Sequence, residues 1–174
     1  VVVGHYGQYQ VTFKKKGYVI SVPGHWMNAK TRLKFSPKSA KTYKLKYKTS
    51  NKKIATISKN GIIRAKKKGT VTITAIAKNN KKAKATTKVT VGKVVKTLKF
   101  KEGTKKTVTA GKKFTLHPTY SPKKASTKAV TFKSSNKKVA TVTSKGKVTA
   151  KKAGKVTITA TCKDAKGKKA KFTV

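Results

Sequence analysis

Side chains that carry acid–base, nucleophilic or metal chemistry are scarce in this sequence. The only carboxylates are Glu102 and Asp164, and they stand in separate glycine-flanked stretches typical of turns. Acid–base catalysis by two carboxyl groups needs them close together, and a calcium site needs several oxygen ligands. We therefore expect no catalytic residue, no metal site and no cofactor.

The histidines and the cysteine show no catalytic or metal-binding pattern either. His5, His25 and His117 lack the spacing of metal ligands, and His117 is expected to be an exposed strand residue. Cys162 is the only cysteine, so no intramolecular disulfide forms. It shares the sequence parity of the apolar residue Ile158, which predicts a small buried core residue rather than a reactive thiol.

Aromatic residues gather in the first 26 positions of the chain. Aromatic faces beside lysines are able to stack on sugars or unpaired bases, which makes Trp26, Tyr18 and His25 the candidate ligand-binding residues. In the alternative interpretation, which we favour, Trp26 and Tyr18 close the end of a folded domain or pack on a preceding one. Tyr6 and Tyr9 belong to the same aromatic segment.

Positive charge is the most unusual property of the sequence. There are 47 Lys and Arg residues against 2 Asp and Glu, a formal net charge of +45, and only Arg32 and Arg64 are arginine. Lysine protects sheet edges from pairing, but mixed charge would do so equally well. The near absence of acid therefore predicts polyanionic partners, such as teichoic acid, acidic glycans or nucleic acid. Because arginine is rare, we do not expect sequence-specific reading of bases.

An internal repeat defines the elements that position these residues. Residues 47–76 align with residues 132–161 without a gap, at a constant offset of 85 positions. The sequence predicts a first domain over residues 9–91, a short linker at 92–93 and a second domain over 94–174. Residues 1–8 are expected to be the end of a preceding domain or an added strand. The aligned identical pairs are Asn51 and Asn136, Gly61 and Gly146, Gly69 and Gly154, and Ile73 and Ile158.

Within each repeat, apolar and polar residues alternate with a period of two. The segments 71–75 and 156–160 alternate Val, Ile and Ala with Thr, which is typical of half-buried antiparallel strands. Short β-branched runs separated by turn signals predict two all-β sandwiches. The predicted structural core contains two equivalent pairs and the cysteine: Tyr47 and Phe132, Ile73 and Ile158, and Cys162.

The sequence also makes predictions about turns and about membrane insertion. Ser50-Asn51 and Ser135-Asn136 are predicted to form turns in which the short polar side chains bond the nearby backbone. No apolar run is long enough to cross a bilayer, so we expect no membrane insertion of this segment.

The second half of each repeat resembles the bacterial immunoglobulin-like domain, group 2. The similarity rests on Ser-Ser-Asn-Lys-Lys-Val-Ala-Thr-Val at 134–142, on the stretch from Gly146 to Gly154, and on Val-Thr-Ile-Thr-Ala at 156–160. It implies tandem immunoglobulin-like Greek-key sandwiches in a secreted or cell-surface bacterial protein, as in intimin- and invasin-type adhesins. It implies no ligand, because one fold serves many functions.

Three functions fit these observations. The first is a non-catalytic structural and adhesive surface module that binds polyanions through diffuse lysine contacts. The second is a carbohydrate-binding module that uses Trp26 and nearby tyrosines. The third is a subunit of an extracellular filament or surface layer, in which residues 1–3 add as a strand to a neighbouring domain. Further immunoglobulin-like domains of the same or a neighbouring chain are the expected protein partners.

Overall fold

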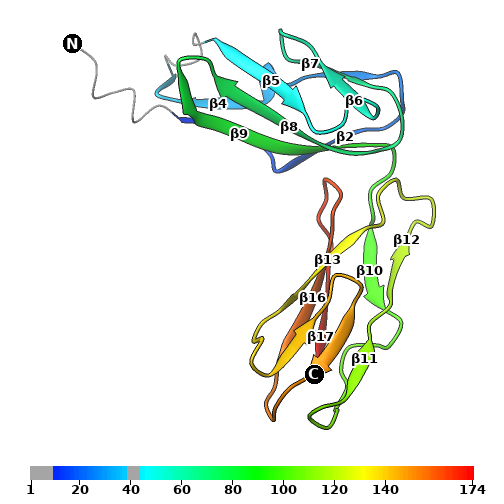
Figure 1. Ribbon diagram of the computed structural model, residues 1–174. Coiled ribbons are helices and arrows are strands. Elements are labelled where there is room, and N and C mark those ends of the chain that lie inside the picture. The colour runs from blue at the N-terminus through cyan, green and yellow to red at the C-terminus, as the bar shows by residue number, and fades with distance from the viewer. Residues whose placement is uncertain (1–9, 39–43) are drawn as a thin grey trace. The chain divides into compact units, whose positions relative to one another are not determined.

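The structure is a computed structural model that describes residues 10–38 and 44–174 (Figure 1). The chain divides into two compact units, Val1–Lys93 and Val94–Val174. Both are built from strands, which confirms the all-β prediction, and residues 1–8 lie outside the described part. Among the described residues, no helix combines the length and apolar character needed to cross a bilayer.

The first unit has nine strands and a 3₁₀ helix within its described residues. Its elements are β1 (Gln10–Phe13), β2 (Gly17–Ile20), β3 (Trp26–Asn28), η2 (Lys30–Arg32), β4 (Leu33–Ser36), β5 (Leu45–Thr49), β6 (Ala55–Ile57), β7 (Ile62–Ala65), β8 (Gly69–Ala77) and β9 (Asn80–Val91). One layer is the sheet β2-β9-β8-β5, in which β2 runs parallel to β9. The other layer contains β3-β7-β6 and the pair β1-β4.

The second unit repeats this arrangement. Its strands are β10 (Thr97–Phe100), β11 (Lys113–Thr115), β12 (Pro118–Ser121), β13 (Val130–Ser134), β14 (Ala140–Val142), β15 (Lys147–Ala150), β16 (Thr157–Cys162) and β17 (Lys169–Thr173). One layer is β13-β16-β17, and the other contains β11-β15-β14 and β10-β12. Lys105 forms a parallel bridge with Thr173, in the place that the β2–β9 pairing has in the first unit.

The residues that alternate with a period of two in the sequence lie alternately on the core-facing and the solvent-facing side of each sheet. Along β8, buried residues alternate with half-buried ones over all nine positions. Ile73 on β8 and Ile158 on β16 are fully buried, each in the core of its own unit. The free energy of apolar burial, about 25 cal/mol for each Å² removed from water, therefore acts on one face of each sheet.

The two aromatic residues of the predicted core are partly rather than fully buried, which corrects the sequence-based expectation. Tyr47 is opposite Ala75 and Phe132 is opposite Ala160, so their positions are equivalent. Both lie on strands at a sheet edge, β5 and β13, where the core is open on one side. Their rings pack over Gly61 and Gly146, whose φ angles of +83° and +86° favour glycine.

The Ser-Asn pairs form the predicted turns. The Oδ1 atoms of Asn51 and Asn136 accept hydrogen bonds from the N–H groups two residues later, at 2.9 and 3.0 Å. The hydroxyls of Ser50 and Ser135 accept from the backbone N–H groups of Thr72 and Thr157, at 2.8 and 2.9 Å. Each pair thus closes its turn and ties it to the central strand.

Candidate functional site

The structure separates the aromatic candidates. Trp26 lies on β3, an edge strand, opposite Arg64 on β7, and its side chain is 62% exposed. His25 precedes it and is also exposed, while its carbonyl accepts a hydrogen bond from Ala65 N–H at 2.9 Å. With this exposure Trp26 does not close the end of the first sandwich, which corrects one part of the expectation. Packing of Trp26 on a preceding domain stays a prediction.

Tyr18 belongs to a different environment. It lies on β2 in the other sheet, and its ring packs edge-on against Phe13 with a centroid distance of 6.4 Å. The guanidinium of Arg32 lies 5.7 Å from the centre of the same ring, and the hydroxyl accepts a hydrogen bond from Lys15 N–H at 3.1 Å. Tyr18 is thus part of the packing of the first unit, and only Trp26 and His25 remain side by side at the surface. His5, Tyr6 and Tyr9 lie outside the described residues.

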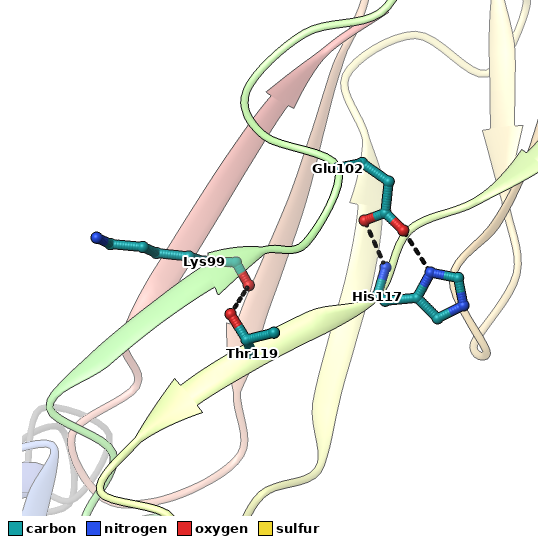
Figure 2. A network of polar contacts seen from close by, with 4 residues as sticks. All are labelled: Lys99, Glu102, His117 and Thr119. Atoms are coloured by element: carbon teal, nitrogen blue, oxygen red, sulfur yellow. Dashed lines mark hydrogen bonds and ion pairs between the residues drawn. The ribbon is translucent and has the colours of Figure 1, made fainter.

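The second unit contains a polar pair that the sequence did not predict. Glu102 follows β10 and His117 precedes β12, and the register of these strands brings the two side chains together (Figure 2). One carboxylate oxygen accepts the backbone N–H of His117 at 2.9 Å, and the other contacts the ring atom Nδ1. The side chain of His117 is 63% exposed, as predicted, whereas that of Glu102 is 22% exposed. The predicted strand position is wrong, because His117 lies in the link between β11 and β12.

This contact changes the acidity of Glu102. Partial burial works to raise the pKa of the carboxyl group, but the hydrogen bonds from the backbone and ring of His117 and the attraction of its charge outweigh burial. The pKa therefore lies below its ordinary value of 4.5. The ionised carboxylate stabilises the pairing of β10 with β12, close to the position where Lys99 pairs with Thr119 (Figure 2).

A pH dependence follows from the lowered pKa. Because the folded state holds the carboxylate ionised, its stabilising effect is complete above the ordinary pKa of 4.5 and disappears as the pH falls through the lower folded pKa. We expect Glu102→Gln to unfold at a lower urea concentration than the wild type at about pH 6, and we expect this difference to shrink as the pH is lowered below 4.5 through the folded pKa. A difference of midpoints that stays constant over this range would contradict the assignment.

Asp164, the other carboxylate, is buried, with 1% of its surface exposed. Its Oδ2 accepts the N–H of Val95 at 2.8 Å, and its Oδ1 accepts those of Lys166 and Gly167 at 2.9 and 3.0 Å. Three backbone donors replace the water that a buried carboxylate loses. Asp164 therefore fastens the beginning of the second unit to the turn between β16 and β17.

Cys162 lies at the end of β16 with 1% of its surface exposed. Its sulfur donates a hydrogen bond of 3.5 Å to the carbonyl of Thr127. The equivalent position in the first unit is occupied by Ala77, which is also buried.

Burial of the thiol should make its labelling slow. We expect a thiol reagent to modify Cys162 slowly in the native protein and rapidly in denaturant, because the thiolate must reach solvent to react. The measurement is the rate of mass addition with and without urea. Rapid, stoichiometric labelling of the folded protein would show that the thiol is accessible.

The described residues contain no cluster of candidate metal ligands. Within residues 10–38 and 44–174, no group of three His, Cys, Asp or Glu side chains is arranged to hold a metal ion. The lysines, by contrast, form a surface: every lysine in the described part of the chain is exposed. A hollow of about 340 Å³ on the first unit shows how densely they gather; its lining includes Lys46, Lys48, Lys78, Lys81 and Lys84.

Comparison with solved structures gives distant similarities. Domains 1–6 of the surface layer protein SbsC match 95% of this chain, over 27% of their own length, at 19% identity and a TM-score of 0.41. The C-terminal fragment of intimin, in complex with the intimin-binding domain of its translocated receptor, matches 76% of this chain and 51% of its own at 15% identity and a TM-score of 0.37. Drosophila N-cadherin EC1–4 matches 95% of this chain and 48% of its own at 12% identity and a TM-score of 0.33.

The family comparison is more direct. A search of curated proteins gave no match. Residues 28–89 and 94–174 match the bacterial Ig-like domain (group 2), one copy in each unit and together well over half of the chain. The chain therefore belongs to the bacterial immunoglobulin-like domain family, group 2.

Proposed function

We propose that this chain is a non-catalytic structural and adhesive segment of a bacterial surface protein that binds polyanionic polymers through many weak lysine contacts. Membership of the bacterial Ig-like family supports the extracellular, structural part of this proposal. The partners are cell-wall polymers such as teichoic acid, acidic glycans, and nucleic acid bound without sequence preference. Other immunoglobulin-like domains are the protein partners.

The observation that carries the polyanion proposal is that the positive charge faces solvent with almost nothing to neutralise it. All described lysines are exposed, and the residues of the first unit include no carboxylate. In the second unit, Glu102 is held by His117 and Asp164 by three backbone N–H groups. A surface of one sign raises the local concentration of oppositely charged polymers and speeds their encounter.

The kind of charge indicates the kind of contact. Lysine carries a compact, strongly hydrated ammonium on a flexible stem, whereas arginine forms the planar, bidentate contacts that recognise particular groups. With two arginines in the chain, attraction rather than geometric recognition should dominate. Binding should therefore depend on the charge density of the polymer more than on its chemistry.

Binding to three unrelated polymers tests this proposal. Teichoic acid, heparin and single-stranded DNA of matched charge density are immobilised, with a neutral polysaccharide as the control. We expect the three polyanions to bind with similar affinity, the neutral polymer not to bind, and any single Lys→Gln variant to change affinity by less than about threefold. Binding that requires one particular lysine would contradict a diffuse mode.

A carbohydrate-binding function is the second candidate, and the 62% exposure of Trp26 favours it. An exposed tryptophan beside Arg64 offers a face on which a sugar ring is able to stack. Tyr18 packs against Phe13 and Arg32 within the first unit and does not add to this platform.

The tryptophan makes this candidate easy to test. Since Trp26 is the only tryptophan, its fluorescence reports directly on that site. If Trp26 forms a sugar platform, a neutral oligosaccharide shifts the emission, and Trp26→Ala abolishes binding while the far-ultraviolet circular dichroism stays unchanged. A glycan array on which only sulfated or phosphorylated ligands bind, equally well with the Trp26→Ala variant, would eliminate the candidate.

A further inference from the structure

The outer faces of the two equivalent sheets carry lysines in register across the central strand. In the first unit, Lys46 on β5 and Lys84 on β9 both pair with Ile76 on β8. In the second unit, Lys133 on β13 and Lys171 on β17 both pair with Thr159 on β16. This rung is equivalent to that of Thr74 in the first unit, two positions along β8 from Ile76. Each unit thus presents a strand flanked on both sides by lysine.

Threonine fills most of the space between the lysines. Thr72 and Thr74 on β8, and Thr157, Thr159 and Thr161 on β16, are half-buried residues of the outer face. Neighbouring strands lie about 4.8 Å apart and residues two positions along a strand about 6.8 Å apart. Lysine stems on the two sides of the central strand therefore rise about 10 Å apart. Between them lies the hydroxyl of Thr159 in the second unit and the side chain of Ile76 in the first, where Thr74 lies two positions along the strand.

No acidic residue lies on either face. The first unit contains no carboxylate in its sequence, and Glu102 and Asp164 lie outside β13, β16 and β17. The face of the first unit is also hollowed, since the space of about 340 Å³ is lined by Lys46, Lys48 and Lys84. Charge and shape both suit a flexible anionic chain that lies along the strands.

Aromatic residues, in contrast, are not part of these faces. Tyr47 borders the hollow, but its ring packs over Gly61 inside the sandwich, and Phe132 packs over Gly146 in the same way. Sugar rings and unpaired bases bind best to exposed aromatic platforms. Ammonium and hydroxyl donors suit the oxygens of a phosphodiester, which accept hydrogen bonds from several directions.

We propose that the outer faces of β5-β8-β9 and β13-β16-β17 are binding surfaces for a linear polyol phosphate polymer of the bacterial cell wall. This inference rests on the proposed function and names the surface and the polymer. Lysines supply the charge from both sides of the strand, and threonine hydroxyls between them donate to phosphate oxygens. Both units carry such a face, so the protein offers the polymer two binding surfaces.

The test compares two variants that lose the same charge. In the face variant, three lysines in each unit become glutamine: Lys46, Lys48, Lys84, Lys133, Lys169 and Lys171. In the turn variant, the same number of exposed lysines at repeat-equivalent turn positions is replaced: Lys52, Lys53, Lys67, Lys137, Lys138 and Lys152. Binding of poly(glycerol phosphate) and of heparin is measured at about 50 mM salt, and circular dichroism verifies the fold of both variants.

We expect the face variant to bind poly(glycerol phosphate) at least about tenfold more weakly than the wild type, and the turn variant to lose less than about threefold. The slope of log affinity against log salt should also fall by about 0.7 for each lost contact in the face variant. Acetylation of the wild-type protein gives a second measurement that does not depend on variants. Bound polymer should protect the six face lysines more strongly than the six turn lysines.

Each contrary result has its own meaning. Equal weakening of both variants, or uniform protection from acetylation, would overturn the assignment of the sheet faces while polyanion binding stands. Wild-type protein that binds heparin but not poly(glycerol phosphate) would overturn the polymer assignment alone. Failure to bind either polymer at low salt would overturn the proposed function itself.

Discussion

Replacing Ile158 by Ala should destabilise the second unit by about 2–5 kcal/mol, because the cavity adds to the lost transfer free energy of the side chain. Ile158 is fully buried near the beginning of β16, the central strand of its sheet, opposite Phe172 in the core of this unit. Few surrounding groups are able to move into the space, since the strands on both sides are held by regular pairing.

The thiol on the same strand provides the measurement. Where labelling of Cys162 requires unfolding of the second unit, its rate in native conditions follows the population of the unfolded form. A loss of 2–5 kcal/mol corresponds to a rate increase of roughly 30-fold to several thousand-fold, at about 1.4 kcal/mol for each factor of ten. Thr159→Ala, on the outer face of β16, is the matched control and should change stability by no more than about 0.5 kcal/mol. Equal rates in the two variants would show that Ile158 does not support the core.

The features of the fold that could be predicted from the sequence are those that follow from the alternation of apolar and polar residues along a strand. An antiparallel strand exposes one face to the core and one to water, so the parity of Ile73, Ile158 and Cys162 predicts the face on which they lie. The Ser-Asn turns were predictable for a similar reason, because their hydrogen bonds involve local backbone groups. The degree of burial of Tyr47 and Phe132 was not, since it depends on which strands form the sheet edge.

The polar contacts of the second unit required the three-dimensional structure. Glu102 and His117 are 15 residues apart, and only the register between β10 and β12 brings them together. Asp164 stands in a glycine-flanked stretch typical of a turn, but one of its three donors, Val95, is 69 positions away in the sequence. In a chain with two carboxylates, both stabilise strand connections.

Affinity for any polyanion should fall steeply with salt, and this is the largest effect that we expect. Each polymer charge neutralised by a lysine releases condensed counterions, so log affinity decreases linearly with log salt. A protein that makes about 6–10 such contacts loses about 10³- to 10⁵-fold in affinity between about 50 and 200 mM salt. The exposed lysines of both units are sufficient in number to make contacts of this order.

The form of the salt curve distinguishes a lysine surface from a specific pocket. The Debye length is about 10 Å at 0.1 M salt and about 3 Å at 1 M, so lysines distant from the polymer cease to contribute as salt rises. A titration against teichoic acid, heparin and DNA of matched charge density should therefore give similar slopes, and cumulative Lys→Gln substitutions should lower the slope stepwise. Binding to one polymer that resists salt and disappears on a single substitution would require a pocket with directional contacts. In that case the net charge of +45 would serve encounter and not recognition.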